Sequence, residues 1–225
     1  MSTSPLPKIA RRGLAQESAD LIREAILSGG FAPGSPLREV ELAASLGVSR
    51  GSVREGLSAL EREGLIQSGW HRGTTVIEVT REDVEEVYTV RAALDRLAAT
   101  TAQSRATDEQ LEELDQLVDA MARQLGGGQD GDGPRLLGLD MAFHNAIYEA
   151  AGNRRLIEAW RAIRSQIHLF QLRRVTLGHE HYRARVVHEH RELAALLRSN
   201  DRERLATVAE EHVDSARRSL LMHIQ

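Results

Sequence analysis

One aspartate and three histidines in the second half of the chain are of types that bind divalent metal ions. Asp140 and His144 lie four residues apart, so a helix would project a carboxylate and an imidazole from one face. His190 precedes a stripe of leucines, and His212 lies among apolar residues near the C-terminus. Such a donor set suits Zn²⁺, Ni²⁺, Mn²⁺ or Fe²⁺. The spacing predicts a divalent metal site; the alternative is that these are hydrogen-bonded structural histidines of the core.

His188 is the alternative to His190 as a ligand of this site. The two residues lie on the same predicted helix, and the apolar positions Leu193 and Leu197 define its inward face. His188 falls on the opposite side of the helix from these leucines. The position of the leucines on the helix therefore favours His190 as the ligand.

Two arginines near the N-terminus have the spacing expected of a helix that reads DNA. Arg50 and Arg54 lie four residues apart and share a helix face. A guanidinium group can bind guanine through two hydrogen bonds or clamp a phosphate. Ser49 and Ser52 add hydroxyl and N–H groups suited to phosphate at the helix start. The arginine face lies away from the apolar stripe of Val53, Leu57 and Leu60.

The alternative for these two arginines is that they are solvated surface charges. Glu55 and Glu61 are the carboxylates that could pair with them in that case. An arginine pair at a helix start, behind a Gly-Val-Ser turn and ahead of Arg72-Gly73, is however hard to obtain by chance. The combined pattern favours a DNA-binding role.

Periodicity in residues 14–79 predicts a small domain of three helices and a hairpin. Helical patterns stop at Gly29-Gly30, Gly47 and Gly64, where glycine supplies the freedom that a helix end needs. Residues 65–79 are short β-prone runs around a turn bounded by glycines. This is the winged helix-turn-helix arrangement, whose second helix enters the DNA major groove. Residues 1–13 show no sustained period and are predicted to be a flexible arm.

Residues 80–225 are predicted to form an all-helical bundle, which makes the fold class mainly α. The glycine-rich stretch 126–133 interrupts the pattern and is predicted to be a loop; it lacks the Gly-Lys-Ser/Thr of a phosphate-binding loop. The six predicted helices cover approximately residues 81–104, 107–125, 134–151, 154–175, 178–199 and 201–223.

The charge distribution bears on whether the chain binds nucleic acid. Its 225 residues carry a net charge of −4, which at first argues against DNA. Residues 1–78 hold nine basic and nine acidic residues, so the acidity belongs entirely to the remainder. DNA binding would then depend on a few arginines on one face.

The chain has no cysteine, no apolar run long enough for a membrane span and no signal-peptide core, so we expect a cytoplasmic protein.

The N-terminal motifs resemble the DNA-binding domain of the GntR family of bacterial transcription regulators. The resemblance rests on residues 37–57 (LREVELAASLGVSRGSVREGL), on residues 60–66 (LEREGLI) and on Arg72-Gly73. The family usually has Thr-Pro or similar where this chain has Gly51-Ser52, and Ala where it has Gly56. The resemblance implies DNA-contacting roles for Arg38, Ser49, Arg50, Ser52, Arg54, His71, Arg72 and Gly73, the last three in the wing.

The C-terminal motifs are similar to the ligand-binding FCD domain of the FadR-like branch of that family. The matching strings are VRAALD (90–95), DMAFH (140–144), AAGNRRL (150–156), EHREL (189–193) and EHV (211–213). The resemblance implies a metal ion held by Asp140, His144, His190 and His212. It also implies a carboxylate effector that meets the metal and Arg91. The alternative role for Arg91 is a salt bridge to Asp95 at i+4.

These features together predict a metabolite-responsive transcriptional regulator rather than an enzyme. It is expected to bind an inverted-repeat operator in double-stranded DNA as a homodimer, with a small organic acid as effector and no membrane partner. One alternative is a metal-dependent enzyme that uses the same Asp/His site, but no His-Glu-x-x-His string and no general base are evident. Another is a metal that only stabilises the bundle.

Overall fold

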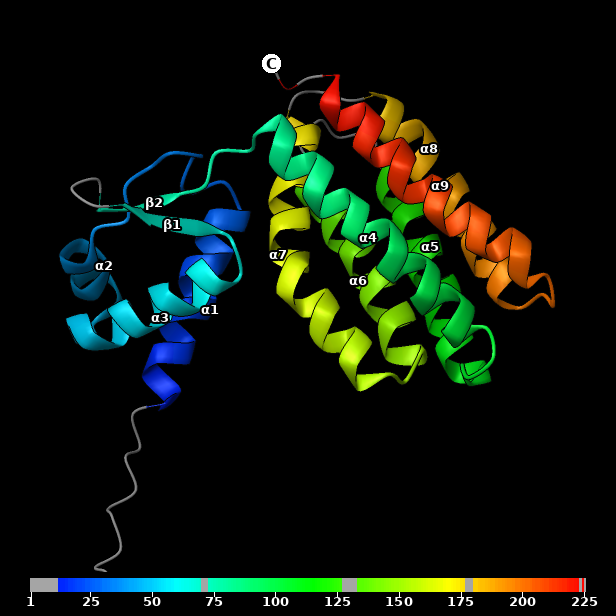
Figure 1. The fold of residues 1–225 in the computed structure, drawn as a ribbon, viewed down its shortest axis with the longest axis horizontal. Coiled ribbons are helices and arrows are strands. Elements are labelled where there is room, and N and C mark those ends of the chain that lie inside the picture. The colour runs from blue at the N-terminus through cyan, green and yellow to red at the C-terminus, as the bar shows by residue number, and fades with distance from the viewer. Residues whose placement is uncertain (1–11, 70–72, 127–132, 177–179, 223, 225) are drawn as a thin grey trace, which may run out of the picture. The chain divides into compact units, whose positions relative to one another are not determined.

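The computed structural model describes residues 12–69, 73–126, 133–176, 180–222 and 224 (Figure 1). The chain divides between Glu78 and Val79 into two compact units, each with its own internal contacts. Within the described residues the first unit holds three helices and a two-stranded hairpin, and the second holds six helices. This confirms the predicted mainly α fold class, with a winged helix-turn-helix pattern followed by a helical bundle.

The helix-turn-helix of the first unit is formed by two short helices joined by a tight turn. The helices are α1 (Arg12–Leu27), α2 (Glu39–Leu46) and α3 (Arg50–Arg62). Gly47 ends α2 with a φ of 65°, and its N–H bonds to the carbonyl of Ala43. Ser49 caps α3, because its hydroxyl oxygen accepts a hydrogen bond from the backbone N–H of Ser52 at 3.2 Å. The turn therefore sets where α3 begins.

Helix α1 packs against α3 along a buried apolar stripe. Its buried stripe consists of Ala15, Ala19, Ile22 and Ile26. The stripe meets α3 at Gly56, which is itself buried. Helix α1 begins at Arg12, so the last two residues of the predicted arm are helical; residues 1–11 lie outside the described part. Burial of Ala15 in the first turn explains why the helix starts this early.

The hairpin consists of β1 (Ile66–Gly69) and β2 (Gly73–Val76), which pair antiparallel with Ile66 opposite Val76. The segment before α2 runs along β2, since the N–H of Leu37 donates to the carbonyl of Thr74 at 2.8 Å. The tip between the strands, including His71 and Arg72, lies outside the described residues. The predicted hairpin is confirmed by the two strands that are described.

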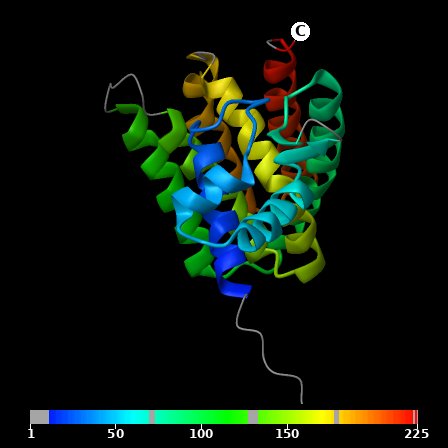
Figure 2. The same cartoon turned by 90° about the vertical axis from the view of Figure 1, so that its left-hand side faces the viewer.

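The second unit is a bundle whose helices run alongside one another in both views (Figures 1 and 2). Helix α4 packs along α9, α5 packs against α6 and α8, and α6 packs against α7. Gly126 ends α5 and Gly133 begins α6, and the predicted loop between them lies outside the described residues. The helices are α4 (Arg81–Ala102), α5 (Asp108–Gly126), α6 (Gly133–Ala150), α7 (Arg154–Thr176), α8 (Glu180–Leu197) and α9 (Arg202–Leu221).

The core of the bundle holds aromatic side chains next to polar ones. The ring of Tyr148 stacks on that of Trp160, with centroids 4.6 Å apart. The indole N–H of Trp160 donates to the Asn145 side chain at 2.7 Å. These contacts hold α6 against α7 in a single register. Among the described residues, no helix is long and apolar enough to cross a membrane.

Two glycines of α3 should respond in opposite ways to alanine. At Gly51 a Cβ would lie 3.7 Å from the Ser49 hydroxyl, an ordinary contact, so Gly51→Ala should raise the free energy of unfolding by about 0.5–1 kcal/mol through helix propensity. At Gly56 a Cβ would lie 2.9 Å from the backbone oxygen of Ala15. Gly56→Ala should therefore lower the free energy of unfolding by about 1–3 kcal/mol, because α1 must shift. Urea unfolding of both variants measures the difference, and equal stability of the two would contradict the close packing of α1 on α3.

Candidate functional site

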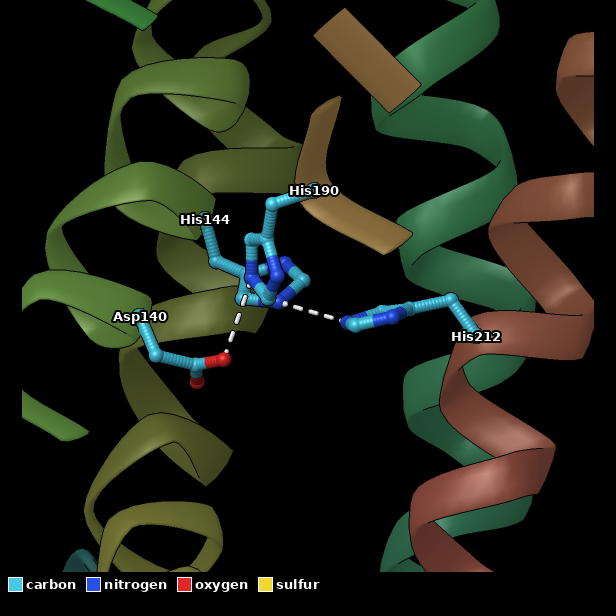
Figure 3. Close-up of side chains that lie close together, drawn as sticks. All are labelled: Asp140, His144, His190 and His212. Atoms are coloured by element: carbon cyan, nitrogen blue, oxygen red, sulfur yellow. Dashed lines mark hydrogen bonds and ion pairs between the residues drawn. The ribbon is translucent and has the colours of Figure 1, made fainter. Parts of the chain in front are cut away.

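Asp140, His144, His190 and His212 converge inside the bundle, although they come from three helices (Figure 3). Helix α6 supplies Asp140 and His144 from successive turns, α8 supplies His190 and α9 supplies His212. One ligand atom from each residue lies within 4.8 Å of those of the other three, and all four residues are buried. We call these four residues the Asp/His cluster. The structure thus brings together the four residues that the sequence singled out.

Each imidazole of the cluster has an acceptor beside its Nδ1 atom. His190 Nδ1 lies 2.7 Å from the carbonyl oxygen of Val186, and His212 Nδ1 lies 3.1 Å from a carboxylate oxygen of Glu189. His144 Nδ1 lies 3.4 Å from a carboxylate oxygen of Asp95. The carbonyl and an ionised carboxylate can only accept hydrogen bonds, so in the neutral imidazoles the proton sits on Nδ1. The Nε2 atoms thereby face the centre of the cluster as acceptors, as in metal-binding histidines. The lone pair of His144 Nε2 also lies 3.0 Å from Arg91 Nη2, a donor that a metal ion at this atom would replace.

The atoms at the centre of the cluster are acceptors that face one another. His144 Nε2 lies 3.2 Å from His212 Nε2, and His190 Nε2 lies 3.0 Å from Asp140 Oδ1, the contacts dashed in Figure 3. Within the described residues, His190 Nε2 and Asp140 Oδ2 have no hydrogen-bond partner that meets geometric criteria. A proton or a metal ion between buried acceptors in mutual contact satisfies both of them. These nitrogen and oxygen donors fit a divalent transition-metal ion.

The protonation states of the cluster also suit a cation. Burial lowers the pKa of His144 well below its ordinary value of 6.5, and the charge of Arg91 acts in the same direction. Burial also lowers the pKa of His212, against the opposing effect of Glu189. For Asp140, burial favours the neutral acid, but the neighbouring imidazoles and guanidinium together hold the pKa well below its ordinary range. A carboxylate at Asp140 and neutral imidazoles at His144 and His212 are the states in which these groups bind metals.

Arg91 is completely buried on α4, next to the cluster. Its Nε lies 3.3 Å from Asp95, which is the i+4 salt bridge that the spacing suggested as an alternative. Its Nη2 also lies 3.0 Å from His144 Nε2, where the guanidinium can only donate. Its Nη1 has no hydrogen-bond partner in the described part of the chain. Arg91 therefore contacts the cluster and keeps one donor unused.

Several residues around the cluster were not identified from the sequence as part of it. Asp95 was considered only as a partner of Arg91, yet it also accepts a hydrogen bond from the Tyr148 hydroxyl at 2.6 Å. Glu189 contacts His212 across two helices, and no local spacing signals such a pairing. His188, the alternative ligand, is exposed on α8 and takes no part.

In the first unit, Arg50 and Arg54 lie exposed on one face of α3, with 61% and 64% of their side chains accessible. Arg54 makes two hydrogen bonds of 2.8 Å to the carboxylate of Glu39 on α2, and Arg50 lies 3.6 Å from the same group. The suggestion that Glu55 or Glu61 would pair with them is wrong: Glu61 instead accepts from the backbone of Ser68. Because α2 packs on α3, Glu39 of α2 is the carboxylate that lies beside both arginines.

The other predicted DNA-contacting residues lie around this face. Ser49 and Ser52 contact each other through their hydroxyls at 3.0 Å at the start of α3. Arg38 precedes α2 and forms an exposed ion pair with Glu41 at 2.8 Å. Gly73 begins β2, whereas the wing residues His71 and Arg72 lie outside the described residues.

Comparisons with family models match both units. Residues 14–76 match the model for bacterial regulatory proteins of the gntR family, and residues 86–215 match the FCD domain. Together these matches span nearly the whole described chain.

Individual relatives are transcriptional regulators. The chain is 34% identical over 172 residues to an HTH-type transcriptional regulator of Streptomyces ambofaciens, covering 76% of this chain and 70% of that protein. It is 32% identical over 156 residues to the "Probable D-xylose utilization operon transcriptional repressor" of Paenarthrobacter nicotinovorans, covering 69% and 67%. The solved structure of E. coli McbR/YncC has the same fold, with a TM-score of 0.81, 21% identity and coverage of 93% and 98%. These matches confirm the prediction of a regulator rather than an enzyme.

The buried imidazoles should make stability fall as the pH is lowered, in the presence of a metal chelator. The folded chain keeps His144 and His212 neutral below their ordinary pKa of 6.5, whereas the unfolded chain takes up protons there, so acid favours unfolding. Between pH 7.5 and 5.5 the free energy of unfolding should decrease by about 1 kcal/mol for each such imidazole. Urea unfolding at each pH measures this slope. His212→Gln should reduce it and His188→Gln should not; a flat or rising profile in the parent chain would contradict the assigned protonation states.

Proposed function

Because this chain belongs to the GntR family of bacterial transcriptional regulators and carries an FCD domain, we propose that it is a metabolite-responsive regulator acting on DNA in the cytoplasm. It binds an inverted-repeat operator as a homodimer, each winged unit reading one half-site. A small organic acid is its effector and binds at the Asp/His cluster. The observation that carries this proposal is the convergence of four metal-binding groups and a buried arginine inside the FCD domain.

The DNA-reading surface is the Arg50/Arg54 face of α3. Glu39 holds both guanidinium groups close together on the exposed side of the helix. An exposed ion pair contributes little stability, so the arginines can exchange Glu39 for phosphates or guanine edges at small cost. Ser49, Ser52 and Arg38 are placed to contact the phosphate backbone, and the wing residues His71, Arg72 and Gly73 complete the contact.

The sensor is a divalent metal held by Asp140, His144, His190 and His212. Zn²⁺, Ni²⁺, Mn²⁺ and Fe²⁺ all accept such a set of three imidazoles and one carboxylate. When bound, the ion supplies a Lewis-acidic point at which a carboxylate can bind. Arg91 adds the unused Nη1 donor beside it, and a guanidinium suits a carboxylate by charge and by shape.

Effector binding regulates DNA binding by shifting a conformational equilibrium. A ligand can move such an equilibrium only by its difference in affinity between the two states. The cluster and Arg91 join α4, α6, α8 and α9, so a ligand there contacts most of the helices of the bundle at once. This placement allows one small anion to alter the packing of the dimerising unit.

Loss of the arginine face should abolish specific DNA binding. Duplexes selected by the parent chain from a random pool should contain an inverted repeat, and fluorescence anisotropy then gives the affinity of each variant. Arg50→Ala and Arg54→Ala should each weaken binding by about 1–3 kcal/mol, that is about fivefold to 150-fold. Arg62→Ala removes the same charge from the exposed end of α3 and should have a much smaller effect. Unchanged binding of the folded Arg50→Ala/Arg54→Ala variant would refute this DNA-reading role.

The metal should stabilise the folded chain through the cluster. After chelation, Zn²⁺ at a hundred times its dissociation constant should raise the free energy of unfolding by about 2.7 kcal/mol. That increase corresponds to a Tm shift of about 5–10 °C for a unit of this size. Asp140→Asn and His190→Gln should lose the shift, while His188→Gln, an exposed histidine of the same helix, should keep it.

Retention of the full shift in Asp140→Asn would place the metal elsewhere. A response to small carboxylates that persists after chelation would mean that the metal is only structural. Thermal-shift measurements with and without chelator distinguish these outcomes.

A further inference from the structure

A second group of buried polar side chains lies beside the Asp/His cluster. Tyr88 lies on α4 three residues before Arg91, Arg174 lies near the end of α7, and Tyr182 lies near the start of α8. Only 1%, 6% and 8% of their surfaces are exposed. We call these three residues the Arg174 group. Neither the metal nor the first carboxylate of the proposed effector uses them.

The Arg174 group presents hydrogen-bond donors that have no acceptor. The hydroxyls of Tyr88 and Tyr182 and the Nε of Arg174 lack a hydrogen-bond partner within the described ranges. Buried donors without partners are rare in folded proteins, because each loses its bonds to water and gains nothing in return. Gln171 Oε1, three residues before Arg174 on α7, is an unpartnered acceptor of the same part of the bundle. The three donors outnumber it and therefore indicate a ligand that supplies acceptors.

Each tyrosine of this region has an arginine beside its ring. The guanidinium carbon of Arg174 lies 4.4 Å from the centre of the Tyr182 ring, and that of Arg91 lies 5.6 Å from the centre of the Tyr88 ring. Burial raises the pKa of the Tyr88 hydroxyl, and the charges of both Arg91 and Arg174 act against this effect. Arg91, which lies beside Tyr88, also contacts His144 Nε2 at 3.0 Å and so links Tyr88 to the cluster. The charge of Asp140 acts on the pKa of both Tyr88 and Tyr182.

The sum of the buried charges in this region indicates how many negative charges the ligand carries. The two buried guanidinium groups of Arg91 and Arg174 are balanced by the two buried carboxylates of Asp95 and Asp140. The more peripheral Glu189 is offset by its ion pair with Arg185 at 2.7 Å. A divalent metal ion in the cluster would therefore leave two positive charges. A ligand with two negative charges neutralises them.

We infer that the Arg174 group binds a second carboxylate of the effector, which makes the effector a small dicarboxylate. The inference rests on the proposed function, because the metal and Arg91 hold the first carboxylate. The guanidinium and the two hydroxyls donate to the second carboxylate, whose oxygens accept. A monocarboxylate leaves the Arg174 group without acceptors and binds more weakly.

The test compares acids that differ only in the second carboxylate. Isothermal titration of the zinc-loaded full chain with butyrate and succinate, and with malonate and glutarate to vary the length, gives the dissociation constants. At least one diacid should bind ten times more tightly than butyrate. Arg174→Met, which keeps an unbranched side chain over the Tyr182 ring, should reduce diacid affinity to the butyrate level and leave butyrate affinity unchanged. Arg155→Met, an exposed arginine of the same helix, should keep the diacid preference.

Tyr182→Phe provides a second variant that removes only a hydroxyl, and it should weaken succinate binding but not butyrate binding. Equal affinity for mono- and diacids in the parent chain, or a diacid preference that survives Arg174→Met, would overturn the inference while leaving the proposed carboxylate sensor intact. Failure of every acid to bind the zinc-loaded chain would instead refute the proposed function.

A further probe is 3-phosphonopropionate, which matches succinate in length but carries more negative charge. Tighter binding of this compound than of succinate would overturn the dicarboxylate assignment.

Discussion

The carboxylate of Asp95 is the group on which the polar interior of the bundle depends. It accepts a hydrogen bond from Tyr148 at 2.6 Å, pairs with Arg91 at 3.3 Å and lies 3.4 Å from His144 Nδ1. A guanidinium can be buried completely only where an opposite charge compensates it, and Asp95 supplies that charge. The same carboxylate places the His144 proton on Nδ1. Asp95 thus compensates the charge of Arg91, which contacts the Asp/His cluster, and fixes the tautomer of His144, which belongs to it.

The bundle combines a closely packed apolar core with a polar region in which, among the described residues, several buried donors and acceptors have no hydrogen-bond partner. Helix α6 serves both, because Phe143 and Ile147 pack into the core while Asp140 and His144 reach the cluster from the same two turns. A rigid apolar core around a site holds its ligating groups in place before any ligand arrives. Ligands that bind only the folded chain add their binding free energy to its stability. In the proposed function, effector binding and stability are therefore coupled in this unit.

The two units use ion pairs of opposite physical character. Arg54 and Glu39 pair on the surface, where water screens the interaction and either partner can be exchanged cheaply. Arg91 and Asp95 pair in the interior, where separating them would leave an uncompensated charge. An ion pair whose partners are easily exchanged suits a surface that binds DNA. An ion pair that is costly to separate suits a buried site whose geometry must stay fixed. The neutral balance of residues 1–78 fits recognition by a few exposed arginines.

Local patterns in the sequence were sufficient to predict the helices, the hairpin and the shared face of Asp140 and His144, since each depends on residues within one or two turns. The inward phase of α8 likewise favoured His190. Long-range pairings could not be predicted this way. Glu39 rather than Glu55 meets Arg54, Glu189 supports His212, and Arg174 lies over the ring of Tyr182. Packing between separate helices decides which of these side chains meet.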